Sequence, residues 1–148
     1  MASAPLSFIA TQGALEVYVG EADQWVVQRG SQVCDTNKLR ARASLLWLPL
    51  LEQDYPTFRQ KVFRGLSSAS PELAARRWAA FPVQELLSLA LTASGSWYWV
   101  DLALAWAADV ELGPQVQMQV QALAFDPSIP QPTRHRAKRL YYTGKSCL

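Results

Sequence analysis

Apolar residues recur at helical spacing from residue 37 onward, between short segments that carry proline, serine or glycine. The first such run predicts a helix over residues 37–52, which Pro49 is able to kink or shorten. Its apolar positions lie three or four residues apart: Leu39, Ala43, Leu46 and Trp47.

Capping residues mark the starts of the next helices. Asp54 and Pro56 predict a second helix, and its apolar face is made of Phe58, Val62, Phe63 and Leu66. Ser70-Pro71-Glu72 predicts a third, because it offers a capping hydroxyl, a proline at the first helical position and an acid in the first turn. Further helices are expected after Pro82, Ser96, Gly113-Pro114 and Pro132-Thr133.

The segment after Gly113 has two readings. Its alternation of apolar and polar residues is also typical of a strand that places Val116, Met118 and Val120 on one side. Pro114 and the Gln and Ala content favour a helix. We therefore expect a helix here.

The first 36 residues have a different pattern. Residues 15–19 and 25–27 are rich in valine and flank a turn at Gly20-Glu-Ala-Asp, which predicts a β-hairpin. An amphipathic helix over 11–29, interrupted by Gly20, is the competing interpretation.

The rhythm of helices predicts a mostly α fold of stacked antiparallel helix pairs, as in an α-solenoid or a compact helical bundle, with a short N-terminal β-hairpin. The length of 148 residues is typical of a single domain, 1–148. Within it we expect an N-terminal segment at 1–36, a helical core at 37–142 and a tail at 143–148.

Composition excludes several classes of protein. Six Trp exclude disorder for most of the chain, and two Cys with one His exclude a disulfide-dense scaffold and a His/Cys metal cluster. We expect no metal and no cofactor. The first ten residues carry no Lys or Arg ahead of an apolar run and so are not expected to be a secretory signal, and Cys34 and Cys147 are expected to be reduced thiols in a cytoplasmic protein. The apolar stretch 83–108 contains Glu85 and Asp101, which favours buried helix over a membrane span.

Charge is segregated along the chain although the net charge is only +2. The blocks 1–28, 29–77, 78–133 and 134–148 carry −3, +5, −5 and +5. Blocks of opposite sign either compensate one another between neighbouring helices or give the protein a dipolar surface that steers a charged partner.

Asp101 is the one weak candidate for a catalytic residue, because it lies among apolar residues, where a carboxyl group without a partner would have a raised pKa. The alternatives are an ion pair, with Arg76 or Arg77, a set of buried hydrogen bonds, or plain exposure. The single histidine, His135, lies between two arginines, Arg134 and Arg136, so it is expected on the surface.

The aromatic residues are expected to serve two roles. Trp47, Trp78 and Trp106 recur with Leu and Ala and are expected in the core. The consecutive residues 97–99 diverge by about 100° per position on a helix, so at least one of their rings is expected to be exposed. Exposed aromatics beside charges are typical of binding hot spots. The residues expected to bind a partner are Trp97, Tyr98, Trp99, Asp101, Asp109, Glu111, Arg134, Arg136 and Lys138.

Two segments carry a resemblance to known proteins: Ser96-Trp-Tyr-Trp-Val-Asp-Leu-Ala-Leu-Ala-Trp and Gln131-Pro-Thr-Arg-His-Arg-Ala-Lys-Arg-Leu. With the prolines at loop ends, the chain over residues 37–142 resembles small bacterial HEAT-like helical proteins, some of which are immunity proteins encoded beside polymorphic toxins. The resemblance implies a rigid surface that occludes the active site of a toxin, with no chemistry of its own. The chain is also similar to HEAT-like DNA glycosylases in the four-residue spacing of Trp97 and Asp101.

The sequence therefore predicts a protein-binding module, with an immunity protein as its specific form, and not an enzyme. A nucleic-acid-binding protein or a HEAT-like DNA-processing enzyme is the alternative. The nucleic-acid-binding alternative depends on the basic last helix, which carries arginines and lysines together with Tyr141 and Tyr142.

Overall fold

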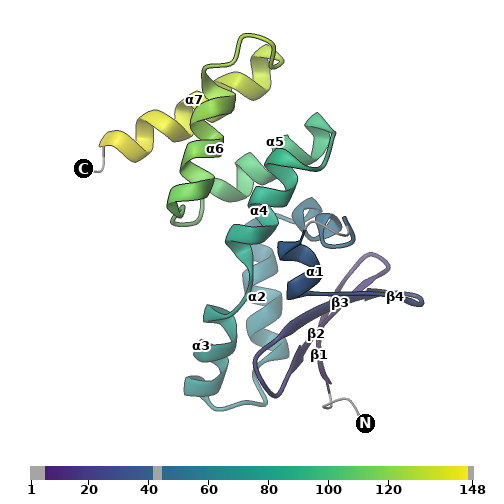
Figure 1. Cartoon of the computed structure of the whole chain (residues 1–148). Helices are drawn as coiled ribbons and strands as arrows, with labels where there is room; N and C mark the ends of the chain where they lie inside the picture. The colour runs from purple at the N-terminus through teal and green to yellow at the C-terminus, as the bar shows by residue number, and fades with distance from the viewer. Residues whose placement is uncertain (1–5, 42–44, 147–148) are drawn as a thin grey trace. The chain divides into compact units, whose positions relative to one another are not determined.

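The structure is a computed structural model that describes residues 6–41 and 45–146, with side chains as far as Thr143. The chain forms two compact units, Met1–Val83 and Gln84–Leu148 (Figure 1). They are described separately below as the N-terminal unit and the C-terminal unit.

The N-terminal unit begins with a four-stranded antiparallel sheet in the order β1-β2-β3-β4. Its strands are β1 (Leu6–Gln12), β2 (Leu15–Gly20), β3 (Trp25–Arg29) and β4 (Gln32–Asp35). Strands adjacent in sequence are adjacent in the sheet because the turns between them are short. Gly13 and Gly30, with φ angles of 60° and 61°, occupy the left-handed conformation that the outer two turns require.

One face of the sheet is buried. Val17 pairs with Val27, and Val27 pairs with Cys34, so these three side chains form a row across one face. All three are fully buried. The alternation of buried and partly exposed residues along β2 is the period of two that the sequence carries over residues 15–19.

Helices of the N-terminal unit follow the sheet. They are α1 (Thr36–Arg40), the 3₁₀ helix η1 (Leu48–Glu52), α2 (Tyr55–Gly65) and α3 (Pro71–Ala79). The side chains of Asp54 and Ser70 accept hydrogen bonds from the backbone amides of Thr57 and Leu73 and so cap α2 and α3 as predicted.

Gly65 allows α2 to approach β1 closely. A Cβ atom at this position would lie 2.2 Å from the carbonyl oxygen of Ile9, so only glycine fits without a shift of the helix or the strand. Lys61, one turn earlier on α2, donates a hydrogen bond to the carbonyl of Thr11 at 3.0 Å. Helix α2 is thus fixed along the first strand.

An aromatic cluster around Phe81 forms part of the core of the N-terminal unit. Trp25 and Trp78 lie 5.1 and 5.2 Å from the Phe81 ring, and Phe58 lies 5.3 Å from it, measured between ring centroids. The indole N–H of Trp25 donates to the carbonyl of Arg77 at 2.8 Å, so this fully buried ring has its polar atom satisfied.

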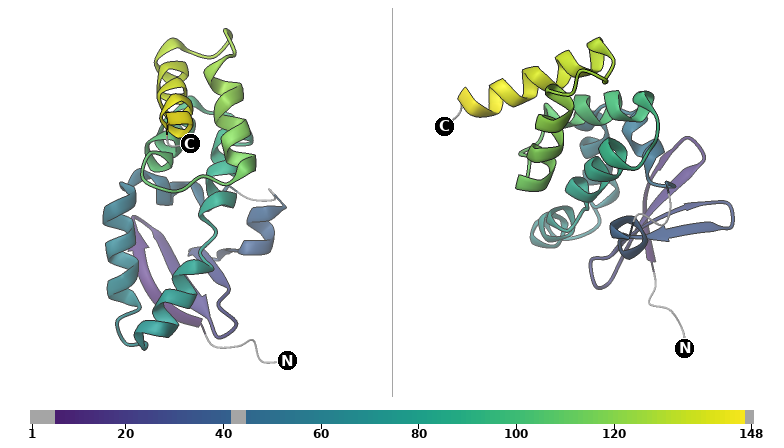
Figure 2. Two further views of the ribbon diagram at one scale, coloured as in Figure 1. Left: turned by 90° about the vertical axis from the view of Figure 1, so that its left-hand side faces the viewer. Right: turned by 45° about the horizontal axis from the view of Figure 1, so that its top comes forward.

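The C-terminal unit is helical. It contains α4 (Val83–Thr92, whose first residue closes the N-terminal unit), α5 (Trp97–Ala107), α6 (Pro114–Ala124) and α7 (Gln131–Ser146). Helix α7 packs against both α5 and α6, as Figures 1 and 2 show. The Gln84 side chain accepts from the amide of Gly113 and donates to the carbonyl of Glu111, both at 2.9 Å, which fixes the loop before α6.

The expected mostly α fold of stacked antiparallel helix pairs is wrong, because 56% of the described residues are helical and 16% lie in the four-stranded sheet, which is a mixed α and β fold. The predicted hairpin is present as β2 and β3, so the competing helix over 11–29 is also wrong. The sheet that contains the hairpin has two further strands, β1 and β4, which the sequence did not indicate. A lone hairpin is marginally stable, and the added strands provide the backbone partners that make it persist.

Several of the helix predictions are confirmed. Residues 114–124 are helical, as preferred over the strand reading. The expected helix 37–52 is divided into α1 and η1, and its predicted position Ala43 lies outside the described residues. The apolar stretch 83–108 is two helices, and none of the helices in the described part of the chain is both long and apolar enough to cross a membrane.

Candidate binding surfaces on helices α5, α6 and α7

The first turn of α5 exposes aromatic side chains. Trp97 and Tyr98 have 45% and 54% of their surface exposed, whereas Trp99 is half-buried. Tyr98 and Trp99 meet edge to face, with ring centroids 4.9 Å apart. The divergence of consecutive helical positions, as the sequence predicts, prevents the three rings from all reaching the core.

Asp101 connects α5 to α7. The hydroxyl of Thr133 donates to its Oδ1 at 2.8 Å, and the guanidinium of Arg136 contacts its Oδ2 at 2.9 Å. Thr133 is buried, and the side chains of Asp101 and Arg136 are 31% and 47% exposed. Both carboxylate oxygens of Asp101 therefore have partners.

The sequence prediction paired Asp101 with the wrong arginines. Arg76 and Arg77 face Asp23 instead, with N–O distances of 2.7 and 3.6 Å, within the N-terminal unit. The ion pair itself was one of the expected alternatives, and its partner is Arg136.

Helix α7 presents its predicted binding residues on two different faces. Arg136 points to α5, whereas Arg134 and Lys138, each two residues away, lie about 200° around the helix. Arg134 donates to the carbonyl of Pro127 at 3.2 Å, and the ammonium group of Lys138 lies 6.0 Å from the Phe125 ring centroid. The structure thus brings Arg136 together with Trp97, Tyr98 and Asp101, a set that we call the α5–α7 surface.

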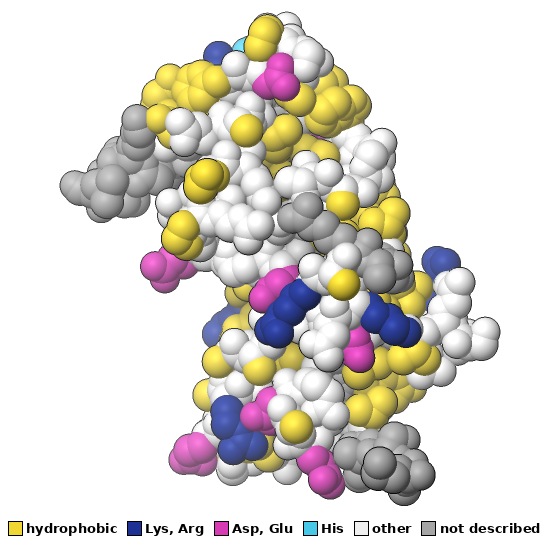
Figure 3. All heavy atoms as spheres, viewed as in Figure 1, with side chains coloured by type: hydrophobic (Ala, Val, Ile, Leu, Met, Phe, Trp, Pro, Cys, Tyr) yellow, Lys and Arg dark blue, Asp and Glu magenta, His cyan; other side chains and the backbone are white. Residues whose placement is uncertain are grey.

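A second surface lies where the end of α6 meets α7. The Phe125 ring packs edge to face with those of Tyr141 and Tyr142, at centroid distances of 5.0 and 6.3 Å. Uncharged side chains cover α6 in the space-filling view of Figure 3. We call this the α6–α7 surface; its residues are Met118, Ala122, Phe125, Lys138, Tyr141 and Tyr142. Sequence reasoning had placed the two tyrosines beside the basic residues but had missed Met118, Ala122 and Phe125.

The two remaining predicted binding residues lie elsewhere. Asp109 and Glu111 are exposed in the loop between α5 and α6. Twelve residues of mostly helical chain, about 18 Å, separate Asp109 from Trp97, so these acids are not part of the α5–α7 surface. Asp126, after α6, has its pKa held below the usual range because the Ser128 hydroxyl and amide donate to it and Arg134 lies nearby.

Metal-binding side chains are scattered in the described part of the chain. Among the residues that the structure describes, no group of three or more His, Cys, Asp or Glu is positioned to hold a metal ion. His135 is exposed. Cys34 is buried in the sheet and donates to the carbonyl of Asp35 at 3.6 Å, and Cys147 lies outside the described residues.

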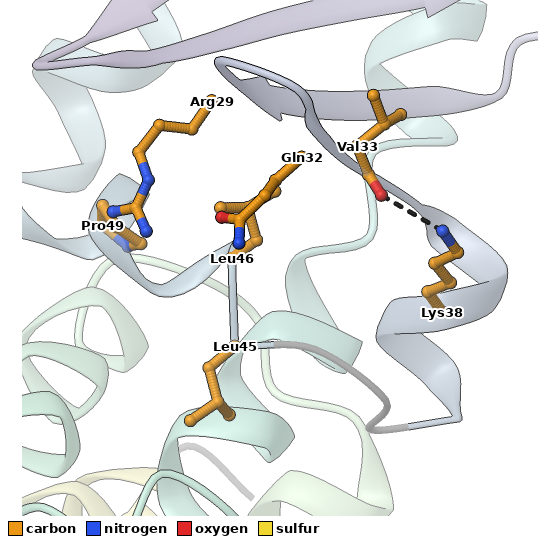
Figure 4. Close-up of a pocket in the computed structure, with 7 residues that line it drawn as sticks. All are labelled: Arg29, Gln32, Val33, Lys38, Leu45, Leu46 and Pro49. Atoms are coloured by element: carbon orange, nitrogen blue, oxygen red, sulfur yellow. Dashed lines mark hydrogen bonds between the residues drawn. The ribbon is translucent and has the colours of Figure 1, made fainter.

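An open pocket of about 560 Å³ lies in the N-terminal unit, beside the β3–β4 turn and η1 (Figure 4). Lys38 at its rim donates to the carbonyl of Val33 at 3.2 Å. Its lining consists of two cations, one amide and four apolar residues: Arg29, Lys38, Gln32, Val33, Leu45, Leu46 and Pro49. Sequence reasoning missed this pocket, because the β3–β4 turn, α1 and η1 form it only once they pack together in the fold.

Comparison with models of protein families, with curated proteins and with solved structures found no match for this chain.

Proposed function

We propose that this chain is a protein-binding module whose contact site is the α5–α7 surface. The observation that carries the proposal is the pair of adjacent exposed rings, Trp97 and Tyr98, one turn from the ion pair of Asp101 and Arg136. Trp, Tyr and Arg are the residues most enriched at binding hot spots. A large aromatic surface beside a fixed charge pair suits a partner that buries the rings and hydrogen-bonds the rim.

The engagement of Asp101 favours binding over catalysis. A general acid or base has to exchange a proton with a substrate, and both oxygens of Asp101 already accept contacts from Thr133 and Arg136. The alternative of a DNA-processing enzyme would need this carboxylate to be available beside Trp97. The proposed module therefore holds its partner and does not transform it.

The partner we propose is a toxin made from a neighbouring gene, which the module would meet in the cytoplasm and whose active site it would cover. This choice rests on the resemblance that residues 96–106 and 131–140 carry to small bacterial helical immunity proteins. The alternating charge blocks of the chain support it also, because they would orient docking on a charged toxin surface.

The test is binding of the purified full chain to the product of the adjacent gene, measured by calorimetry. Trp97→Ala combined with Tyr98→Ala is expected to weaken binding by about 30-fold or more, since hot-spot truncations cost about 2 kcal/mol. Phe8→Ala is the matched control, because Phe8 on β1 is an equally exposed ring, 53%, in the other unit.

Two results would contradict the proposal. One is an unchanged affinity of the Trp97 and Tyr98 variant for a product that the wild type binds. The other is no binding to the adjacent product together with turnover of a nucleic-acid substrate that Asp101→Asn abolishes.

A further inference from the structure

Helix α6 is apolar on two opposite faces. Val116, Val120 and Ala124 are buried against the unit. About 180° around the helix, Met118 is 70% exposed and Phe125, just beyond the helix end, is 49% exposed. Exposed Ala122 lies between them, so this second stripe also has the spacing of four and three residues that is typical of a contact face.

The outer stripe has no charge beside it on its own helix. From Gly113 to Phe125 the chain contains no Asp, Glu, Lys or Arg, and its polar residues are all glutamines. The exposed face of a surface helix normally carries charged residues. Depletion of charge combined with exposed Met and aromatic residues is the composition found at the centre of protein interfaces.

A positive charge lies at only one end of this stripe. Lys138 reaches over the Phe125 ring from α7, and it has no carboxylate partner among the residues that the structure describes. Asp126, the nearest acid in sequence to Phe125, is hydrogen-bonded to Ser128. The α6–α7 surface is therefore an apolar stripe that ends in aromatic rings and a cation.

We propose that the α6–α7 surface docks an amphipathic helix of a partner protein, with apolar residues along Met118, Ala122 and Phe125 and carboxylates at the Lys138 end. The stripe from Met118 to Phe125 is about 10 Å long, which matches two turns of a docked helix. Burial of the apolar stripe supplies affinity, and the contact with Lys138 fixes the direction of the partner helix.

A protein partner fits this surface better than a nucleic acid does. Single strands need cations along the backbone and open ring faces for the bases. Helix α6 offers no cation, and the ammonium of Lys138 lies over the ring of Phe125 while Tyr141 and Tyr142 meet that ring edge to face.

This docking site is separate from the α5–α7 surface. Lys138 and Arg136 point about 200° apart around α7, so the two surfaces are independent targets for mutation. The proposal concerns a different contact site from that of the proposed function and does not require it.

The experiment selects peptides from a displayed library of random 16-residue sequences against the full-length protein. Affinities of the selected peptides are then measured by fluorescence anisotropy. We expect a consensus of apolar residues at positions i, i+4 and i+7 with Asp or Glu at one end. Met118→Glu is expected to weaken these peptides by about 30-fold and Lys138→Glu by about 10-fold, because each removes one element of the surface. Phe8→Ala is the matched control, because Phe8 is an exposed ring on β1 that belongs to neither surface, and it is expected to change affinity less than about twofold.

Variants at Met118 are expected to fold, since its side chain is largely exposed, and Met118→Ala gives a milder second test. The proposal is overturned if no selected peptide depends on Met118, or if the recovered peptides lack acidic residues. It is also overturned if a labelled single-stranded 20-nucleotide DNA binds more tightly than the selected peptides and loses affinity with Lys138→Glu.

Discussion

Removal of the carboxylate of Asp101 should loosen α7 from α5. The Thr133 hydroxyl is buried and donates to Asp101 at 2.8 Å, and a hydrogen bond to a charged group contributes about 1.5–3 kcal/mol. The Arg136 contact is half-exposed and adds only about 0.2–1 kcal/mol. We therefore expect Asp101→Ala to lower the free energy of unfolding by about 2–3 kcal/mol.

A double-mutant cycle isolates the hydrogen bond. Thr133→Val keeps the side-chain shape but removes the donor, so the effects of Thr133→Val and Asp101→Ala should not add. The expected coupling is about 1–2 kcal/mol. Urea unfolding followed by circular dichroism gives the global value, and amide hydrogen exchange within α5 and α7 gives the local one.

The reasoning would be refuted by a coupling below about 0.5 kcal/mol, which is what independent sites show. Asp101→Asn is a further control. It retains an acceptor for Thr133 but loses the charge that Arg136 contacts, so it should cost only about 0.5–1 kcal/mol. If Asp101→Asn lowered the free energy of unfolding more than Asp101→Ala, the carboxylate would have a role other than these two contacts.

Three other predictions concern single side chains. Trp25→Phe should destabilise the chain by about 1 kcal/mol more than Trp47→Phe, because of these two indole N–H groups that of Trp25 has a hydrogen-bond partner and that of Trp47 has none. Equal urea midpoints for the two variants would contradict this prediction. Gly65→Ala should lower the free energy of unfolding by about 1–3 kcal/mol, because the new methyl group clashes with β1. Gly13→Ala should lower it by about 1 kcal/mol, because Gly13 has open space around it but a left-handed backbone. A lower melting temperature for Gly13→Ala than for Gly65→Ala would be evidence against the close approach of α2 and β1. Hydrogen bonds from the Thr57 hydroxyl and, second, the Thr57 amide lower the pKa of Asp54 below its usual value of 3.8. The stabilisation of α2 by the ionised Asp54 cap is therefore complete above pH 3.8 and is lost as the pH falls through the lowered pKa. Carboxyl titration by NMR checks this, and Asp54→Ser should keep the cap in acid.

Helix starts were predictable because their chemistry is local. Asp54, Ser70 and Pro71 act on amides or dihedral angles within three residues, and α2 and α3 begin beside them. Strands β1 and β4 were missed because their stability depends on neighbours. The register shift between Phe8 and Ala10 interrupts the alternation of β1, and β4 has only four residues.

The candidate surfaces were predictable only where they depend on local helical geometry. Exposure within residues 97–99 follows from helical geometry alone. The partnership of Asp101 with Arg136 does not, because it depends on how α5 packs on α7. The predicted position of Met118 depends on whether its segment has the two-residue period of a strand or the 3.6-residue period of a helix. A strand groups it with the buried Val116 and Val120, whereas a helix places it on the opposite face.

The order of elements in the N-terminal unit has a consequence during synthesis. The sheet is complete at Asp35, but α2, which packs on β1, ends at Gly65. At roughly 5–20 residues per second, a ribosome needs about 2–6 s to add those thirty residues. During this interval β1 lacks the helix that Gly65 and Lys61 place against Ile9 and Thr11, so the first strand of the new sheet has no helix packed along it.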